Sequence, residues 1–442
     1  MSAPHPFTIH NFRAYWLARL SNTLAQMAMV IVIGWQVYDI ARQTMSIRDA
    51  AFQLGWIGVA QFVPLLLLSL VAGLVADRVD RRWIARGAVA LEAACALLLA
   101  WLTYHGAITL PWLFFVAALL GVARAFAGPA LQALAPNLVP IAVLPAAIAM
   151  SSIAWQAGSV LGPAMGGYLY AANQWLPYAV SAGLFGLGFV MLTLIKPVER
   201  KQMTGTRNPW AQMVDGLAYV RRNRLVLGAI SLDLFAVLLG GATAMLPIYA
   251  RDILQIGADG LGHLRAAPAA GAVLVAIWFA WKPLTNDVGV KMLWSVAAFG
   301  AATAMFGLSA PLLLPYLGTA AIGSDFAPAV LVALVSLFVV GATDMVSVYV
   351  RQSLIQLHTP DDMRGRVGAV STLFVSGSNE LGEARSGFLA AAVGPVVAVV
   401  GGGIAAILVT AWWARLFPEL GRARTFAPPE TLEFTSIKET TI

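Results

Sequence analysis

Residues 161–169 read LGPAMGGYL, and residues 381–389 read LGEARSGFL. The same offset of 220 residues aligns several identical pairs: Gly121 with Gly341, Gln132 with Gln352, Pro140 with Pro360, and Ser151 with Ser371. A shorter match relates Leu54-Gly55 to Leu261-Gly262. The second half of the chain therefore repeats the first half in the same order.

The composition favours a membrane environment. Hydrophobic residues make up 60% of the chain and charged residues only 11%, whereas soluble domains carry about 25% charged residues. Segments of about 20 apolar residues cross a bilayer as helices, and the sequence holds twelve candidates: 14–38, 52–76, 84–104, 111–135, 142–172, 175–195, 225–250, 260–281, 289–310, 327–356, 364–393 and 395–417. The alternation of a spanning β-strand is missing. We predict an all-α membrane protein of twelve transmembrane helices in two six-helix bundles.

Basic residues indicate the orientation. If the N-terminus is cytoplasmic, the opposite side holds only Arg42, Arg48 and Arg251 among the basic residues. Cytoplasmic loops of membrane proteins carry such an excess of Lys and Arg. We expect a multi-pass protein of the inner or plasma membrane, with both termini cytoplasmic and contacts to membrane lipids. The net charge of +7 is then an orientation signal, and no nucleic-acid partner is expected.

Polar stretches divide the chain into five parts. They are an N-terminal lead (1–13), a first bundle (14–195), a cytoplasmic linker (196–224), a second bundle (225–417) and a cytoplasmic tail (418–442). In the linker, Trp210, Met213 and Leu217 recur at helical spacing, which predicts an amphipathic helix on the membrane interface.

The sequence offers little support for an enzyme. Its five histidines are scattered without metal-ligand spacing, and it contains no Walker-type nucleotide loop. The single cysteine, Cys95, excludes an intrachain disulfide. We expect no metal, no cofactor and no ATP-driven pumping.

The loop after the second predicted span carries an ordered motif, GLVADRVDRR at residues 73–82. Gly73 permits close helix approach, Asp77 suits a helix N-terminus, and Arg78 and Arg81 hold the loop at the cytoplasmic surface. Asp287 occupies the corresponding place after the eighth span, without the arginines. The motif either gates the bundles or only fixes the topology.

A small-residue stripe runs along the fifth span. Gly158, Gly162 and Gly166 recur every four residues, with Pro163 and Gly167 among them. Such a stripe allows close helix packing, and a proline inside a helix bends it. We expect this packing to influence which side of the membrane the bundles open to.

Charges inside the predicted spans are the main functional candidates. Each costs roughly 2.5–3.5 kcal/mol at mid-bilayer and needs a partner, a wet cavity or a function. Arg124 and Asp344 occupy equivalent repeat positions, which suggests a pair or a shared site. Asp233 and Arg19 lie at comparable depth and suggest a gate pair. Structural salt bridges remain the alternative to substrate or proton coupling.

Glu380 and Glu383 lie one turn apart on one helix face. Two carboxylates in a low dielectric repel each other when both are charged, which favours proton uptake near neutral pH. The proton-coupling candidates are therefore Asp233, Asp344, Glu380 and Glu383. A structural network with Arg385 is the alternative, and Glu92 is interpreted as structural.

Uncharged polar side chains in the spans are the remaining candidates. They contact either substrate or a neighbouring helix, and they are Asn22, Gln26, Gln61, Gln132, Gln156 and Gln352.

The loop at 73–82 resembles the signature between spans two and three of the major facilitator superfamily. Residues 158–167 resemble the antiporter motif of that superfamily, and residues 360–367 with 378–383 are similar to its enterobactin-exporter-like branch. The resemblance implies a monomeric secondary exporter that exchanges protons for small amphipathic molecules of drug or siderophore type. A proton-coupled importer and a transporter-like receptor or scaffold without flux remain alternatives.

Overall fold

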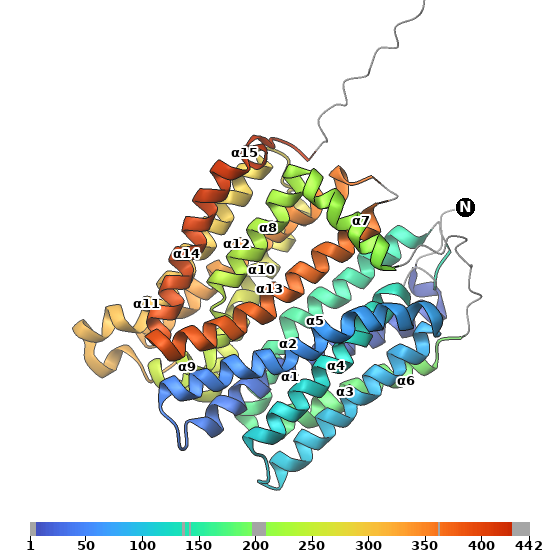
Figure 1. Cartoon of the computed structure of the whole chain (residues 1–442). Coiled ribbons are helices and arrows are strands. Elements are labelled where there is room, and N and C mark those ends of the chain that lie inside the picture. The colour runs from blue at the N-terminus through green and yellow to red at the C-terminus, as the bar shows by residue number, and fades with distance from the viewer. Residues whose placement is uncertain (1–5, 135–137, 141–142, 197–208, 361–362, 427–442) are drawn as a thin grey trace, which may run out of the picture.

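The computed structural model describes residues 6–134, 138–140, 143–196, 209–360 and 363–426. Regular structure within these ranges is helical (Figure 1). The helices up to the linker are η1 (Pro6–Thr8), α1 (His10–Ala41), α2 (Ile47–Arg78), α3 (Arg81–Tyr104), α4 (Leu110–Leu134), α5 (Leu144–Ala172), α6 (Leu176–Thr193) and α7 (Pro209–Arg222). They are followed by α8 (Arg224–Gly240), η4 (Thr243–Met245), α9 (Leu246–Ile248), η5 (Tyr249–Ile253), α10 (Gly257–Trp281), α11 (Val288–Leu317), η6 (Gly318–Ala321), α12 (Pro328–His358), α13 (Arg364–Val393), α14 (Pro395–Leu416) and α15 (Pro418–Arg422).

The long helices begin and end close to the predicted apolar segments, with two differences. The seventh segment is not one helix, because α8 ends at Gly240 and the chain continues through η4, α9 and the π-helical η5. The ninth segment is longer than predicted, since α11 runs on through Pro311 and Pro315. Ten helices in the described residues are long and apolar enough to cross a membrane.

Polar side chains cap several helix starts and so fix where the spans begin. The Ser46 hydroxyl accepts from the Asp49 amide at the start of α2, and Asn223 caps α8 in the same way through the Val226 amide. Asp80 accepts from the Arg82 amide at 3.0 Å and begins α3. Such caps satisfy amide groups that have no partner within the helix.

The helices pack in two groups. Helices α1–α6 pack on one another, and so do α8 and α10–α14; we call them the first and the second helix group. The groups meet where α2 lies along α13 and α5 lies along α10 (Figure 1). We call the end that holds His10, Arg81 and Leu416 the terminal end, and the end that holds Ala41 and Gly257 the far end.

Helix α7 lies where the linker helix was predicted, although its first side chains and residues 197–208 lie outside the described part of the chain. It packs on α13, where the Arg366 guanidinium lies 3.4 Å from Asp215. The Tyr219 hydroxyl donates to the His358 carbonyl at the end of α12 at 2.5 Å. The linker helix is thus attached to the second helix group.

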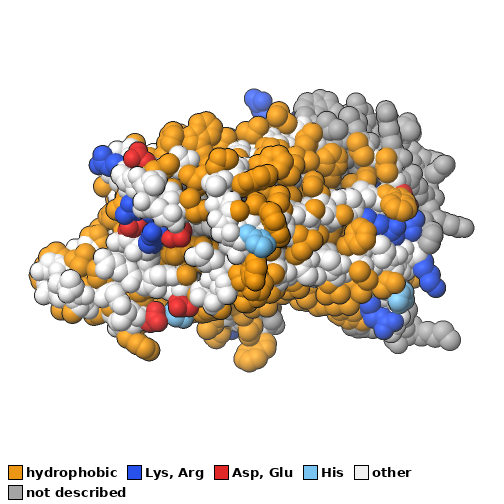
Figure 2. All heavy atoms as spheres, turned by 90° about the horizontal axis from the view of Figure 1, so that it is seen from below, with side chains coloured by type: hydrophobic (Ala, Val, Ile, Leu, Met, Phe, Trp, Pro, Cys, Tyr) orange, Lys and Arg blue, Asp and Glu red, His pale blue; other side chains and the backbone are white. Residues whose placement is uncertain are grey.

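The exterior is largely apolar. Figure 2 shows hydrophobic side chains over much of one face, with charged side chains gathered in a few places. Trp294 on α11 and Leu408 on α14 are 72% and 65% exposed. Such a surface matches a lipid environment, where backbone polar groups are satisfied inside helices.

Candidate functional site

A buried ion pair joins α8 to α12. The Arg351 Nη2 atom lies 3.3 Å from Asp233 Oδ2, and the two residues are 3% and 4% exposed. Asp344, two turns before Arg351 on α12, interacts electrostatically with both of them. We call Asp233, Asp344 and Arg351 the acid cluster, which combines two carboxylates with one guanidinium.

A cavity of about 10 Å³ lies beside the acid cluster. Its lining residues are Asp233, Ala236, Val237, Val296, Phe299, Thr343, Asp344 and Ser347. The Ser347 hydroxyl and the Nε and Nη1 atoms of Arg351 are buried without a hydrogen-bond partner among the described residues. Because an unsatisfied buried polar atom costs about 1–3 kcal/mol, the site is polar and incompletely satisfied.

The acid cluster carries one net negative charge when both carboxylates are ionised. The sequence predicted different partners, Arg19 for Asp233 and Arg124 for Asp344. The structure instead pairs Asp233 with Arg351 and places Asp344 within electrostatic range of the same guanidinium. Arg351 lies within the tenth predicted span, residues 327–356. Its spacing of seven residues from Asp344 places both on one face of α12, and this signal could have identified the cluster.

Arg19 and Arg124 have partners within the first helix group. Arg19 donates from Nη1 to the Tyr15 hydroxyl and from Nε to the Ser151 carbonyl, each at 3.2 Å. Arg124 Nη1 donates to Gln61 Oε1 at 3.5 Å. These bonds connect α1 to α5 and α4 to α2.

Glu92 lies at the centre of a polar network in the first group, and it is fully buried. Gln26 Nε2 donates to Glu92 Oε1 at 3.5 Å, and Asn22 and Arg124 also interact with the carboxylate. Oε2 of Glu92 has no hydrogen-bond partner among the described residues. Three candidate residues, Asn22, Gln26 and Arg124, thus interact with an acid that was expected to be structural.

Side chains from α10 and α13 satisfy the backbone where the seventh span is broken. Arg385 Nη1 donates to the last two carbonyl groups before Gly240, at 3.1 and 2.5 Å. The Ser386 hydroxyl donates to the Gly241 carbonyl at 2.8 Å. Arg265 Nη2 donates to the Thr243 carbonyl at 2.9 Å. Broken helices persist within a membrane when neighbouring groups satisfy the freed carbonyls in this way.

Glu383 interacts electrostatically with Arg265 across this break. The side chain of Glu380 lies outside the described residues, so the Glu380–Glu383 pair stays a prediction. The same holds for the side chain of Gln132. Gln156 is half-buried and Gln352 is exposed.

The loop motif is described only in part. The surroundings of Gly73 and the side chains of Asp77 and Arg78 lie outside the described part of the structure. Arg81 is the first residue of α3. The predicted role of an acid at a helix start is filled by Asp80. Asp287, immediately before α11, has a left-handed backbone with φ of 51° and makes no capping bond through its side chain.

The glycine stripe of α5 packs within the first group. A Cβ on Gly158 would lie 2.6 Å from the Thr23 side chain, and one on Gly162 would lie 2.7 Å from the Leu24 carbonyl, both on α1. Gly166 also faces α1, and Pro163 lies inside α5. The three glycines at four-residue spacing therefore pack α5 against α1. Gly167, the remaining glycine of the motif, faces the second helix group instead.

Gly167 meets the second helix group directly. A Cβ on Gly167 would lie 2.6 Å from the Gly262 Cα on α10. On the other side of the interface, a Cβ on Gly387 of α13 would lie 2.3 Å from the Gly55 nitrogen of α2. Gly167 and Gly387 are repeat equivalents, as are Gly55 and Gly262, so the two crossings are related by the duplication. Both lie in the helix halves nearest the far end.

Two ion pairs join the groups at the far end. Arg42 Nη2, after α1, lies 2.9 Å from Asp252 in η5, and Arg251 in η5 pairs with Asp39 of α1. Tyr38 donates its hydroxyl to Asp252 at 2.5 Å. We call these the far-end ion pairs. Their arginines, Arg42 and Arg251, are two of the three basic residues predicted for the side opposite the cytoplasm.

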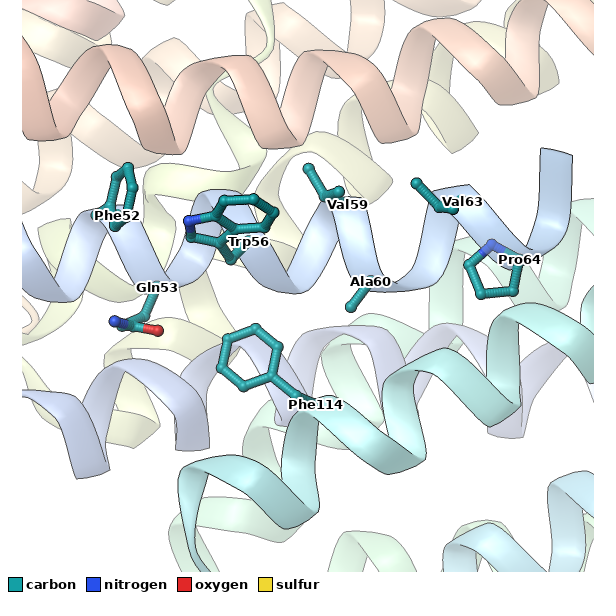
Figure 3. Close-up of a pocket in the computed structure, with 8 residues that line it drawn as sticks. All are labelled: Phe52, Gln53, Trp56, Val59, Ala60, Val63, Pro64 and Phe114. Carbon is teal, nitrogen blue, oxygen red and sulfur yellow. The ribbon is translucent and has the colours of Figure 1, made fainter. Parts of the chain in front are cut away.

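An apolar groove of about 600 Å³ runs along α2 (Figure 3). Phe52, Trp56, Val59 and Val63 of α2 line it, with Phe114 of α4 opposite. Phe52, Trp56 and Val63 are 43–46% exposed. The groove has the character of a lipid-facing surface, and its lining residues carry no ionisable group.

These features define a multi-pass membrane protein with several charged residues, among them Glu92, Asp233 and Arg351, buried between its helices. A profile of the Major Facilitator Superfamily matches residues 14–383. The chain therefore belongs to this superfamily and is a transporter rather than an enzyme.

Curated relatives match the chain over nearly its whole length. It is 25% identical over 429 residues to the enterobactin exporter EntS of Shigella boydii serotype 18, covering 95% of each protein. The enterobactin exporter EntS of Escherichia coli O1:K1 / APEC gives the same identity and coverage.

Solved structures show the same fold at low identity. A D-xylose–proton symporter superposes with a TM-score of 0.66 at 15% identity, covering 92% of this chain and 98% of that one. A POT family transporter bound to a thioalcohol-conjugated peptide gives a TM-score of 0.69 at 13% identity, covering 92% and 96%.

Proposed function

We propose that this chain is a proton-coupled exporter of small amphipathic organic molecules, of drug or siderophore type. The observation that carries the coupling is the acid cluster, in which the buried ion pair of Asp233 with Arg351 has a second carboxylate, that of Asp344, within electrostatic range. A net negative charge within a bilayer costs roughly 2.5–3.5 kcal/mol. Binding one proton removes that charge. The proton affinity of the cluster therefore depends on the environment that the helices give it.

The direction of transport is supported by the relatives, which are named exporters. A proton that enters an inside-negative cell gains about 2.3 kcal/mol per 100 mV. An acid that is protonated from outside and releases its proton inside can use this gain to move a substrate outward. Antiport is therefore the exchange that the proposal requires.

The two helix groups, which we interpret as two six-helix bundles (residues 14–195 and 225–417), support a mechanism of alternating access. The contacts in the far half are the glycine crossings and the far-end ion pairs. In the proposed orientation, with both termini cytoplasmic, the far end faces outside, and these contacts would close it to the outside. Opening that end requires the ion pairs to separate.

Everted membrane vesicles test the proposal. Vesicles containing the protein are energised with a proton gradient, and uptake of ethidium and of iron-free enterobactin is measured against vesicles without it. Gradient-dependent uptake of either probe supports export. Uptake that appears only in right-side-out vesicles would indicate an importer, and binding without flux would indicate a receptor or scaffold.

A further inference from the structure

The cavity beside the acid cluster has the size and polarity of a site for one water molecule. Its volume is about 10 Å³, and a single water requires a cavity of about 10–15 Å³ when the volume is measured in this way. Asp233 reaches it from α8, and Asp344 and Ser347 reach it from α12. Buried waters occupy sites where otherwise unsatisfied polar groups converge.

Ser347 provides an observation that is independent of the two acids. It is 3% exposed and lines the cavity, yet its hydroxyl has no partner among the described residues. Two nitrogen atoms of Arg351, one turn further along α12, also have no hydrogen-bond partner among the described residues. By contrast, Thr343, which also lines the cavity, bonds to the Val339 carbonyl at 2.7 Å. Ser347 is therefore the hydroxyl available to a bound molecule.

We propose that this cavity holds one water molecule, that Ser347 positions it, and that it relays a proton between Asp344 and Asp233. The inference rests on the proton coupling proposed above and names the path of the proton. The other lining residues are Ala236, Val237, Val296, Phe299 and Thr343, and none of them titrates. The groups that exchange charge are thus Asp233, Asp344 and the facing Arg351.

The relay conserves atoms and charge. The carboxyl O–H bond of Asp344 breaks as its proton passes to the water, and the water gives one of its own protons to the Asp233 carboxylate. Asp344 is then ionised and Asp233 neutral. The attraction between Arg351 and Asp233 falls, and Asp344 becomes the stronger partner of Arg351. Transfer of one proton therefore changes which residue the guanidinium binds, and α8 is released from its ion pair with α12.

Infrared difference spectroscopy tests the site without any substrate. Spectra induced by a pH jump are recorded from the protein in lipid bilayers, in ordinary water and in water labelled with ¹⁸O. We expect an O–H stretching band that shifts with ¹⁸O and is lost in Asp344→Asn. The band persists in Ser347→Thr, which keeps the hydroxyl, and disappears in Ser347→Val, which fills the cavity. Ser336→Val, at a buried serine three turns earlier on α12, is the matched control.

Transport separates this inference from the proposed function. Ser347→Val is expected to lose about tenfold of gradient-driven transport, the effect of losing one buried hydrogen bond, while gradient-free substrate exchange shows that it is folded. If the valine variant does not fold, Ser347→Ala, which removes the hydroxyl but does not fill the cavity, is expected to lose gradient-driven transport in the same direction. Absence of an ¹⁸O-sensitive band in the native protein, or a band unchanged in Ser347→Val, would overturn the inference. If transport by the native protein did not depend on a proton gradient, the proposed function would be overturned instead.

Discussion

Gly387 of α13 lies against Gly55 of α2 so closely that a Cβ on Gly387 would be 2.3 Å from the Gly55 nitrogen. The repeat-equivalent crossing joins Gly167 and Gly262. Small residues at such positions let two helices approach within backbone contact. The two crossings hold the helix groups together near the far end, and their symmetry follows from the duplicated sequence.

Gly387→Ala is expected to favour separation of the far end. The added methyl group meets backbone that cannot yield easily, and overpacking of this kind costs about 1–3 kcal/mol. Spin labels at Tyr104→Cys and Phe326→Cys, two exposed far-end positions, report the distance between the groups in a Cys95→Ala background. We expect a larger population at long distances. Gly183→Ala, where a Cβ meets nothing within 4 Å, is the control, and equal distributions in both variants would contradict the prediction.

The far-end ion pairs give a second, electrostatic prediction. Asp39→Asn or Arg251→Gln is expected to shift the same label distances toward the open form by about 0.5–1 kcal/mol, because both partners are partly exposed. The exchanged variant, Asp39→Arg with Arg251→Asp, should restore the native distribution. High salt should weaken the native pair but change Asp39→Asn less. If the exchanged variant opens as far as the single variants, the charges do not act as a pair.

The two acids of the cluster should differ in their effect on stability. Asp233→Asn breaks the buried ion pair with Arg351. Breaking such a pair costs roughly 3–5 kcal/mol, reduced by the attraction that Arg351 regains from Asp344. Asp344→Asn leaves that ion pair intact and removes the excess negative charge, so its effect should stay within about 1 kcal/mol. Thermal unfolding in lipid nanodiscs measures both, with the exposed Asp259→Asn as control. Equal destabilisation by the two substitutions would show that Asp344 is also needed for the ion pair.

Arg385→Met tests the break in the seventh span. The substitution removes two hydrogen bonds to carbonyl groups at the end of α8, and leaving buried carbonyls unsatisfied costs about 1–3 kcal/mol each. We expect a lower unfolding temperature and faster hydrogen exchange in residues 241–256. Arg415→Met, at an exposed arginine on α14, should leave both unchanged. Unaltered exchange in Arg385→Met would mean that the break is held by other contacts.

The sequence predicts helix positions well because apolar length determines where a chain can cross a membrane. The ends of α3 and α13 are accordingly close to their predicted bounds. The break after Gly240 was not predicted, although Gly240-Gly241 and Pro247 were visible, because the carbonyl partners come from distant helices.

The sequence predicted the two acids of the candidate site but not which arginine interacts with them. Asp233 and Asp344 were identified as charges within the spans, but repeat symmetry suggested arginines from the other half of the chain as their partners. The actual partner, Arg351, lies on the same helix as Asp344. Pairing depends on how α8 and α12 are rotated about their axes, and residue depth alone does not specify this. In the same way, the contact of Gly167 with α10 instead of α1 depends on how α5 is rotated about its axis.

Proton movement through the reconstituted protein tests the central claim most directly. Proteoliposomes that contain a trapped pH-sensitive dye receive enterobactin or ethidium on one side, and the pH of the lumen is followed in the native protein and in Asp344→Asn. The account predicts that substrate moves protons in the opposite direction in the native protein, and that Asp344→Asn exchanges substrate without moving protons. Proton movement of equal size in Asp344→Asn would contradict it.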